Sequence, residues 1–255
     1  MTHDTSLTEE EKIRYDRHLK VPQIGAAGQL MMKNASVLIV GTGGLGSASA
    51  LYLAAAGIGR IGIIDHDCVE LSNLQRQIIH ATANLGEPKV VSAEKKLVDL
   101  NPNIEVDPLH LRIDSENAKE ILGKYQIIID ATDNFETRYV VNDACVELEK
   151  PFIFGAVFQF YGQMSVFDAS KNACLRCIFR NTSDDQTGLT LEKPGIVSPL
   201  PGMIGTLQAI EAIKIILGVG KPAIGRLLLF DGLDMTFQEI QIQKDQSCPV
   251  CSSKG

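Results

Sequence analysis

Val37-Leu38-Ile39-Val40-Gly41-Thr42-Gly43-Gly44-Leu45-Gly46 is the stretch that decides the fold of this chain. Its four leading apolar residues indicate a buried parallel strand, and residues 47–56 have the small side chains of a closely packed helix. A glycine-rich turn between a strand and a helix favours phosphate binding, because the backbone approaches the anion and the helix N-terminus faces it. The stretch predicts a nucleotide-binding α/β fold.

Charged residues after the glycine turn favour a triphosphate over a dinucleotide. Asp65 ends the next apolar run, residues 61–64, at the place where a carboxylate reaches a ribose hydroxyl. Arg76 and Lys89 come later in the chain. A pyrophosphate between two sugars needs little beyond the helix end, whereas a triphosphate that loses pyrophosphate needs additional positive charge. The combination predicts an ATP site.

Each of these residues also has a simpler interpretation. Gly41, Gly43 and Gly46 satisfy the Rossmann glycine pattern, which fits a dehydrogenase equally well. Asp65 fits a solvated acid at a strand end, and a single arginine or lysine is most often a surface charge. The nucleotide site therefore rests on the combination and not on the glycines alone.

Asp133 is the candidate metal ligand of this site. It follows the buried strand expected over residues 126–130, and open α/β sheets bind ligands at the carboxyl ends of their strands. A carboxylate there is suited to holding Mg²⁺ against ATP phosphates, since that ion prefers hard oxygen ligands. The alternative is a helix N-cap, because Asp133 precedes a helix expected from about Glu136. Both roles fit the sequence.

Length, charge and hydropathy bound the class of protein. The chain has 255 residues and a formal charge of −7, which predicts one α/β domain and argues against binding nucleic acids or anionic membranes in general. No run approaches the roughly 18 apolar residues of a membrane span. Residues 1–20 are polar and lack the apolar core of a signal peptide. We expect a cytoplasmic protein.

The six cysteines predict a structural zinc site. Cys174 and Cys177, and Cys248 and Cys251, form two pairs with the spacing of zinc knuckles. A redox dithiol explains one pair, but two distant pairs fit a single four-thiolate site better. Four protein ligands would leave no open position, so the ion should hold the C-terminal tail and take no part in catalysis. We expect the remaining two cysteines, Cys68 and Cys145, to be small buried apolar side chains.

Periodicity predicts how the helices and strands alternate. Thr8 and Glu11 form a capping box before the first helix, and Pro88 marks the start of another. We expect helices over residues 9–19, 26–33, 47–56, 89–100, 115–122, 136–149 and 203–217. We expect strands over residues 37–40, 61–64, 104–109, 126–130, 152–155, 163–168, 226–230 and 235–242. Strands alternate with helices up to residue 155, which favours a doubly wound parallel sheet.

The pattern changes in the C-terminal third. The strand over residues 163–168 could pair antiparallel with its predecessor through a turn at Tyr161-Gly162. Residues 172–199 show little periodicity and are long enough for a functional loop or lid. Glu211 and Lys214 are expected on the outer face of the last long helix. We therefore predict a Rossmann-like mixed sheet of about eight strands, parallel then antiparallel, with helices on both faces.

Taken together, these residues resemble the HesA/MoeB/ThiF family, the adenylyltransferases that are similar to ubiquitin-activating enzymes. The resemblance covers nearly the whole chain. It lies in the glycine turn, both cysteine pairs, Arg14-Tyr15-Asp16-Arg17-His18, Ser72-Asn73-Leu74-Gln75-Arg76-Gln77, Gly86-Glu87-Pro88-Lys89 and Ala131-Thr132-Asp133-Asn134. It implies one domain over residues 1–255, with N-terminal helices (1–35), a nucleotide-binding part (36–156) and a carrier-binding and zinc part (157–255).

The resemblance implies that ATP adenylates the C-terminal glycine of a small ubiquitin-like sulfur-carrier protein. The carrier would end in Gly-Gly and serve sulfur incorporation in cofactor or tRNA biosynthesis, of molybdopterin or thiamine type. The implied catalytic residues are Asp133, Arg76, Lys89 and Arg17. The implied nucleotide-binding residues are Gly41, Gly43, Gly44, Gly46, Asp65, Ser72, Asn73, Gln75, Arg76, Lys89, Asp133 and Asn134.

Two further arginines acquire roles from the resemblance alone. Arg17 matches an arginine that reaches the ATP phosphates of the neighbouring subunit, which implies a homodimer with two composite sites. Arg138 matches a position near the tail of the carrier. ATP, Mg²⁺ and Zn²⁺ are the implied cofactors.

One position departs from the family. Members commonly carry a cysteine in the loop before the last long helix, and that place falls at about Leu191. No cysteine lies between Cys177 and Cys248. We therefore expect no covalent carrier intermediate through this loop, release of the carrier as an acyl-adenylate, and a separate sulfur donor.

Two other functions compete with adenylation. A nicotinamide-dependent oxidoreductase explains the glycines and Asp65, but it gives Arg76, Lys89, Asp133 and the cysteine pairs no role. A non-catalytic scaffold that binds the carrier would retain only a vestigial nucleotide site. The presence of every expected cation argues against the scaffold.

Overall fold

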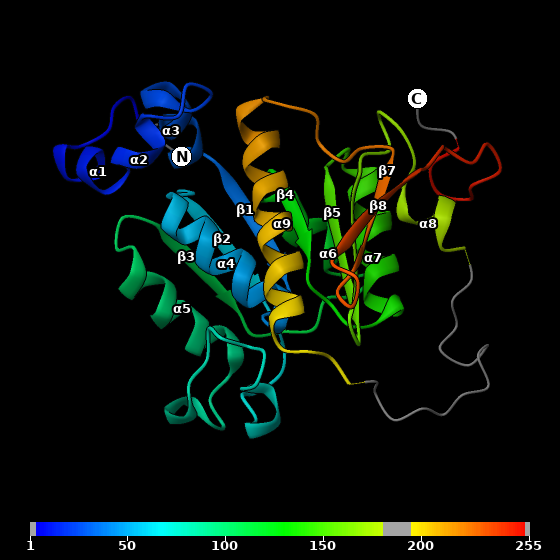
Figure 1. Cartoon of the computed structure of the whole chain (residues 1–255), viewed down its shortest axis with the longest axis horizontal. Helices are drawn as coiled ribbons and strands as arrows, with labels where there is room; N and C mark the ends of the chain where they lie inside the picture. Colours follow the sequence, from blue (N-terminus) through cyan, green and yellow to red (C-terminus); the bar gives the residue numbers. More distant parts are fainter. Residues whose placement is uncertain (1–3, 181–194, 253–255) are drawn as a thin grey trace.

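An eight-stranded mixed sheet runs through the centre of the molecule (Figure 1). The structure is a computed structural model and describes residues 4–180 and 195–252. The strand order is β3-β2-β1-β4-β5-β6-β7-β8, parallel from β3 to β5 and antiparallel from β5 to β8. The strands are β1 (Ser36–Val40), β2 (Arg60–Ile64), β3 (Glu105–Leu109), β4 (Ile127–Asp130), β5 (Phe152–Phe158), β6 (Tyr161–Phe167), β7 (Arg226–Asp231) and β8 (Thr236–Gln241). The predicted mixed sheet is confirmed.

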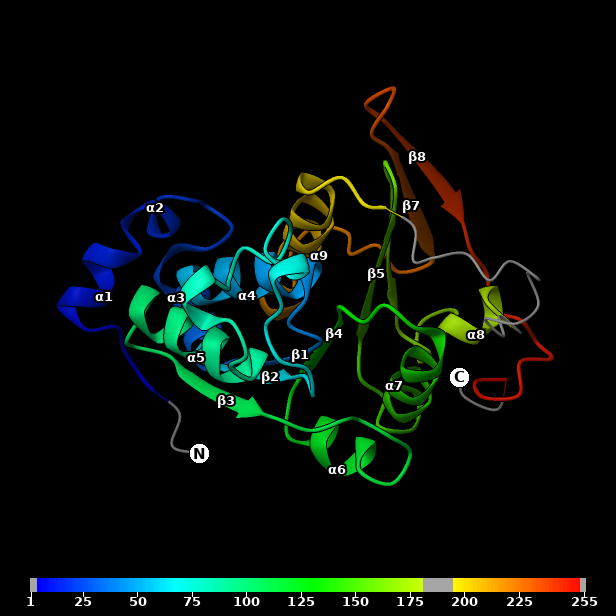
Figure 2. The same ribbon diagram turned by 90° about the horizontal axis from the view of Figure 1, so that it is seen from below.

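Helices cover both faces of the sheet, and the view from below separates the two layers (Figure 2). One layer holds α3 (Gly25–Lys33), α4 (Gly44–Ala56), α5 (Lys89–Leu100) and α9 (Pro199–Leu217). The opposite layer holds α6 (Ala118–Gly123) and α7 (Phe135–Glu147). The shorter elements are α1 (Glu9–Arg14), α2 (Asp16–Leu19), α8 (Leu175–Ile178), η1 (Leu71–Asn73) and η2 (Thr82–Asn84).

The central strands are apolar throughout because both of their faces are buried. Val37 and Ile39 of β1 join the core under α4 and α9, while Leu38 and Val40 join the core under α6 and α7. Successive side chains of a strand point to opposite faces, so an uninterrupted apolar run supplies both cores at once. This explains why short runs without periodicity predicted the parallel strands.

Helix α9 is the core helix of the antiparallel part. Among the described residues it alone is long and apolar enough to cross a membrane, but 44% of that apolar stretch is buried inside the fold. It packs along α4 and against β5. Its apolar composition is therefore explained by packing.

Several expected boundaries differ from the observed ones. The first helix is divided at Tyr15, a buried residue whose hydroxyl accepts a hydrogen bond from the Asn101 side-chain amide at 2.9 Å. The Thr8 capping box is present as predicted. The hairpin turn is Gln159-Phe160, because Phe158 pairs with Tyr161; the expected turn at Tyr161-Gly162 is wrong.

The expected outer position of Glu211 is also wrong. Its side chain is buried, where it accepts hydrogen bonds from Lys214 at 2.6 Å and from the amide of Ala223 at 2.9 Å. Helical spacing located Glu211 away from the apolar positions, but the segment before β7 folds over that side of α9. The division of the chain at residues 35 and 156 stays a prediction.

Candidate functional site

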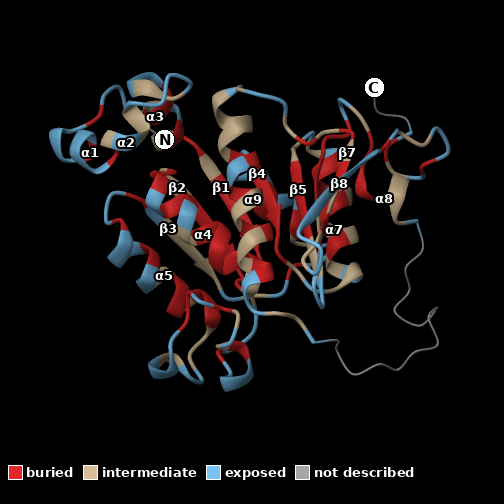
Figure 3. Ribbon diagram, in the orientation of Figure 1, coloured by how far each residue is buried: buried red, intermediate tan, exposed pale blue. Residues whose placement is uncertain are grey.

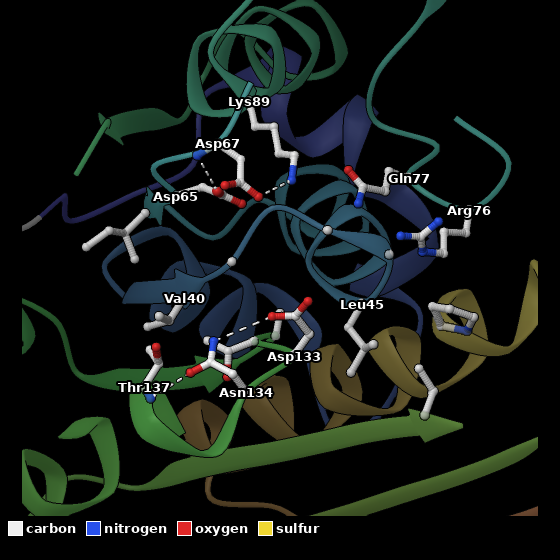
Figure 4. A pocket seen from close by; sticks show the side chains of 18 of the residues that line it. Val40, Leu45, Asp65, Asp67, Arg76, Gln77, Lys89, Asp133, Asn134 and Thr137 are labelled. Carbon is white, nitrogen blue, oxygen red and sulfur yellow. Dashed lines mark hydrogen bonds and ion pairs between the residues drawn. The ribbon is translucent and has the colours of Figure 1, made fainter. Parts of the chain in front are cut away.

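A cavity of about 500 Å³ lies at the carboxyl ends of the parallel strands (Figure 4). Val40 of β1, Ile64 of β2 and Ala131 after β4 form its floor. The chain leaves β1 for β2 on one side, whereas β4 lies on the other side, so the connections diverge here. Such a switch point leaves a crevice above the sheet, which is where open α/β folds bind ligands.

The glycine turn forms one wall of this cavity. Gly41 has φ of 96°, and a Cβ atom there would lie 2.7 Å from the carbonyl oxygen of Ala131, so only glycine fits. A Cβ atom on Gly46 would lie 2.0 Å from the carbonyl oxygen of Gly41. Gly46 therefore lets α4 pack against the turn, and it does not line the cavity itself. Helix α4 begins at Gly44 and presents its N-terminus to the cavity.

Asp65 is fixed at the end of β2 by three hydrogen bonds. Its Oδ2 accepts from the backbone N–H and the hydroxyl of Thr42 at 2.8 and 2.9 Å. Its Oδ1 accepts from the backbone N–H of Asp67 at 2.9 Å. A carboxylate offers about four acceptor positions, so one remains for a sugar hydroxyl. Thr42 of the glycine turn thus orients Asp65, the residue predicted to bind the ribose.

Lys89 and Asp67 form an ion pair inside the cavity. The Lys89 ammonium lies 2.8 Å from Asp67 Oδ2, and the lysine side chain is only 7% exposed (Figure 4). Burial alone would raise the pKa of Asp67, but the Lys89 charge outweighs it and the pKa is lowered. Asp67 therefore stabilises a buried ammonium until an anionic ligand enters.

Asn134, and not Asp133, is the N-cap of α7. The Asn134 side chain accepts a hydrogen bond from the backbone N–H of Thr137 at 2.9 Å (Figure 4). Asp133 is exposed and lines the cavity one residue earlier. The capping alternative for Asp133 is wrong, because its neighbour satisfies the helix end. The Asp133 carboxylate lines the cavity and accepts from the Asn134 side-chain amide at 3.5 Å, while Asn134 Oδ1 caps the helix.

The segment from η1 to Gln77 forms the opposite wall. Arg76 lines the cavity and donates from Nη1 to the carbonyl oxygen of Ser72 at 3.1 Å. Gln75 donates to the carbonyl oxygen of Ile196 at 3.3 Å, which ties this wall to the chain before α9. Asn73 is buried and accepts from the backbone N–H of Glu70 at 3.2 Å. Hydrogen bonds among its own residues and to the chain before α9 thus shape this wall.

Most residues expected at the site meet in this cavity. Those that line it are Gly41, Gly43, Gly44, Asp65, Gln75, Arg76, Lys89, Asp133, Asn134 and Arg138. Those that do not are Gly46, Ser72, Asn73 and Arg17. Arg17 is exposed on α2 and does not line the cavity of its own chain.

Sequence reasoning did not select Gln77, although the structure brings it into the site. Gln77 lines the cavity, is 5% exposed, and its Oε1 has no hydrogen-bond partner within the described part of the chain. Its amide is turned toward Lys89 (Figure 4). A buried amide oxygen without a partner is costly, which marks Gln77 as a group available to a ligand. The sequence signal that could have selected Gln77 is its position directly after Arg76.

His80 holds the glycine turn from behind. Its ring is 7% exposed, with Nδ1 2.9 Å from the hydroxyl of Ser92 on α5 and Nε2 3.2 Å from the carbonyl oxygen of Thr42. Burial lowers the pKa of His80 below its usual value. A neutral ring that donates from Nε2 to Thr42 and accepts at Nδ1 satisfies both contacts. The histidine thus joins the turn to the helix that carries Lys89.

A second candidate site lies at the C-terminal end of the chain, beside α8. The Sγ atoms of Cys174, Cys177, Cys248 and Cys251 all lie within 4.8 Å of one another. Two of these separations are 3.7 and 3.4 Å, and a tetrahedral ion with Zn–S bonds of about 2.3 Å needs separations near 3.8 Å. The backbone N–H of Asp245 lies 3.4 Å from the Cys177 sulfur. The cluster therefore fits a four-coordinate zinc ion.

The two single cysteines differ from each other. Cys145 is buried in α7, as expected. Cys68 is exposed, so the expectation that it is buried is wrong. It follows His66 and Asp67 in a loop that leaves the sheet after β2, where the surrounding core has ended. Leu191, the position of the missing family cysteine, lies outside the described residues.

Comparison with known proteins gives consistent matches. The model of the ThiF family matches residues 15–250. The sulfur carrier protein adenylyltransferase of Thermus thermophilus is 44% identical over 97% of this chain and 93% of its own length. The adenylyltransferase and sulfurtransferase MOCS3 of Aedes aegypti is 47% identical over 96% of this chain. This chain spans 56% of that relative's length, so MOCS3 has a further region that this sequence does not match.

Solved structures share the fold. The crystal structure of E. coli MccB with ATP superposes with a TM-score of 0.83 at 25% identity, over 93% of this chain and 74% of that one. MccB with MccA-N7isoASN gives a TM-score of 0.84 at 23% identity, over 95% of this chain and 75% of that one.

Proposed function

The chain belongs to the ThiF family, and from that membership we propose that it uses ATP to adenylate the C-terminal carboxylate of a small ubiquitin-like sulfur-carrier protein. One observation carries the proposal: a single cavity joins a phosphate-binding glycine turn to Arg76, Lys89 and Asp133. Relatives named as adenylyltransferases, one of them for sulfur carrier proteins, support it.

The proposed reaction needs positive charge more than it needs a protein nucleophile. A carboxylate oxygen of the carrier attacks the α-phosphorus of ATP, the bond to the β-phosphate oxygen breaks, and pyrophosphate leaves. Two anions must meet, so cations that offset their repulsion lower the barrier. Lys89 and Arg76 line the phosphate side of the cavity beside the α4 N-terminus. In the proposed reaction both would neutralise charge that develops on the leaving pyrophosphate.

Lys89 would gain a second anionic partner when the nucleotide binds. Its ammonium pairs with Asp67 at 2.8 Å. A phosphate oxygen would replace or share that contact, so the buried lysine stays paired throughout. Asp133 lies across the cavity, and its carboxylate would hold Mg²⁺, which would stabilise the phosphate charge when bound. The hard oxygen of an exposed carboxylate in a phosphate site fits that ion.

Arg17 extends the proposal to a second subunit. It is exposed on α2 and does not line the cavity of its own chain, so a contribution to catalysis requires another copy. We propose a homodimer in which Arg17 completes the partner's site. Arginine suits this task because its planar group binds phosphate oxygens in pairs.

The product proposed is a carrier acyl-adenylate that leaves without forming a covalent bond to this chain. Cys145 is buried in α7, and the thiols of Cys174, Cys177, Cys248 and Cys251 cluster as metal ligands. Cys68 is exposed but does not line the cavity. A separate sulfur donor would then complete the transfer. The cytoplasmic location expected from the sequence stays a prediction.

Exchange of labelled pyrophosphate into ATP tests the proposal directly. We expect exchange only when a carrier with a C-terminal Gly-Gly and Mg²⁺ are both present, and none when the carrier lacks its last glycine. A thermal-shift series provides the second arm: ATP with Mg²⁺ should raise the unfolding temperature, whereas NAD should not. Stabilisation by NAD without exchange would favour an oxidoreductase and end the proposal.

Whether the carrier becomes covalently attached to this chain is tested by a separate measurement. Mass spectrometry of the denatured protein, after incubation with carrier and Mg-ATP without reductant, should show only the unmodified chain. A carrier adduct that disappears in a Cys68→Ser variant would contradict release of a free acyl-adenylate. The proposed ATP binding and pyrophosphate exchange would not be contradicted by that result.

A further inference from the structure

We propose that Arg138 is a positioning residue, which fixes the loop that carries Asp133 against strand β5. The inference rests on the proposed function, because it concerns how Asp133 is aligned for Mg-ATP. It differs from a contact with the carrier tail, since it acts before any carrier binds. Three observations support it: where the β4–β5 pairing ends, what the guanidinium contacts, and how the group is enclosed.

Strands β4 and β5 pair over only two positions. Ile128 pairs with Phe152 and Ile129 pairs with Ile153, and beyond this point β5 continues while β4 ends. The residues just after the last pair, 130–132 and 154–155, are buried or half-buried, so their carbonyl groups between β4 and β5 need donors other than the neighbouring strand. Asp133 follows three residues after β4 ends, so its position depends on what supplies those donors.

Two long side chains supply them from opposite layers. Gln208 of α9 donates to the carbonyl oxygens of Asp130 at 2.6 Å and Ile153 at 3.1 Å. From α7, Arg138 Nη2 donates to the carbonyl oxygens of Thr132 at 2.7 Å and Gly155 at 3.1 Å. Each group therefore joins one residue of the β4 end to one residue of β5, as a ladder hydrogen bond would do.

The Arg138 contact is the one next to Asp133. Thr132 is the immediate neighbour of Asp133. The backbone N–H and the hydroxyl of Thr132 also donate to Asp130 Oδ1, at 3.0 and 2.6 Å. The Asp130 carboxylate is fully buried and forms an ion pair with Arg138 Nε at 3.1 Å. Thr132 is thus held by its carbonyl, its amide and its side chain, which leaves Asp133 little freedom of position.

The guanidinium itself is held in one plane. The rings of Phe135 and Phe154 lie with centroids 5.4 and 5.1 Å from its central carbon, and the residue is 7% exposed. Cation–π contact and enclosure favour a flat group with several donors in fixed directions. A lysine would keep the charge near Asp130 but could not donate to both carbonyl oxygens and fill the space between the rings.

The test is Mg-ATP binding without carrier, measured by calorimetry on the full-length zinc-loaded protein. Arg138→Lys should weaken Mg-ATP binding by about 10-fold or more, as expected when a charge-assisted contact is misaligned. In buffer freed of Mg²⁺ beforehand and without chelator, the same variant should bind ATP with wild-type affinity, because the glycine turn and Asp65 are unchanged. A general structural defect would lower ATP affinity both with and without Mg²⁺, so a loss confined to Mg-ATP indicates a role in positioning Asp133.

Arg226→Lys is the matched control. Arg226 of β7 likewise donates to two carbonyl oxygens, of Lys221 at 2.8 Å and Pro222 at 3.1 Å, and pairs with Glu239 at 2.9 Å. It lies outside the cavity, so its replacement should leave both affinities unchanged.

Arg138→Gln combined with Asp130→Asn covers the case in which Arg138→Lys does not fold. This pair removes both buried charges together and should show the same Mg²⁺-dependent loss. Equal affinities of the variants and wild type, or an equal loss with and without Mg²⁺, would overturn the inference. A wild-type protein that binds no ATP would overturn the proposed function and this inference together.

Discussion

All four residues of β4, in the middle of the sheet, are buried, whereas all six residues of β8, at its antiparallel edge, are exposed (Figure 3). β4 is covered by α9 on one face and α7 on the other. β8 leaves the rings of Phe237 and the side chain of Ile240 accessible. The parallel part is thus stabilised by burial on two faces, and the edge of the antiparallel part is not.

The chain after β8 is held by a different means. Cys248 and Cys251 lie against Cys174 and Cys177, and they form a small core with Val146 and Ala169. Four thiolates around one ion can supply several kcal/mol of stability to a tail that buries little apolar surface. We therefore expect the nucleotide site to depend on the apolar core and the C-terminal tail to depend on a bound metal ion. The following predictions test that division.

The largest effect is expected for Asp133→Asn. The change keeps the shape of the side chain but removes a hard anionic ligand, so carrier-dependent pyrophosphate exchange should fall on the order of 100-fold. The zinc content and the unfolding temperature should stay at wild-type values, because Asn134 caps α7. Asp99→Asn, at an exposed position of α5, is the control and should exchange normally. Normal exchange in Asp133→Asn would remove this carboxylate from the mechanism.

Removal of zinc should affect the C-terminal tail and not the nucleotide site. Metal analysis of the reduced protein should give one zinc per chain, and prolonged chelation should increase hydrogen exchange in residues 174–178 and 244–252 first. After the chelator is removed and Mg²⁺ restored, ATP affinity should remain within about twofold of the starting value. Simultaneous loss of protection in β1 and β4 would show that the two halves are one cooperative unit.

The same division explains which features the sequence could predict. Strands buried on two faces are uninterrupted apolar runs, so the parallel half and its glycine turn were recognisable with boundaries correct to within about four residues. Cysteine spacing predicted that the two pairs meet, and the structure brings all four thiols together. The ends of helices and turns were less certain: Asn134 took the capping role from Asp133, and the hairpin turns at Gln159-Phe160.

The sequence did not predict contacts between segments that are far apart along the chain. Glu211 was assigned to a surface by helical spacing, yet it binds the amide of Ala223 inside the fold. The contacts of Arg138 depend on which strands meet at the switch point, and no local pattern encodes that. Cys68 was placed in the core by residue type, although its loop lies beyond the core.

A smaller effect is expected for Gln77→Leu. The variant loses an amide that faces the phosphate side, so ATP affinity should fall about 10-fold, whereas adenosine affinity should not change. Without nucleotide the unfolding temperature should stay equal or rise, because the buried Oε1 has no partner within the described residues. A lower unfolding temperature with unchanged ATP affinity would mean that Gln77 serves the fold and not the ligand.

The smallest effect concerns the pH dependence of stability, through His80. Burial lowers the pKa of this ring in the folded protein below its usual value of 6.5. As the pH falls below about 6.5, the unfolded chain takes up a proton that the folded chain does not, so the free energy of unfolding decreases. This contribution is complete above pH 6.5 and is lost progressively as the pH falls toward the lower folded pKa.

His80→Gln should reduce that slope. The variant should be less stable at pH 7.5 by about 1 kcal/mol, because the contacts to Thr42 and Ser92 are weakened. Between pH 6.5 and 5.5 it should lose less stability than wild type, as measured by urea unfolding at each pH. His110→Gln, at an exposed histidine, should keep the wild-type slope. If His80→Gln and wild type lose stability in parallel over this range, the histidine beneath the glycine turn does not stay neutral, and the pH response of the nucleotide half has another origin.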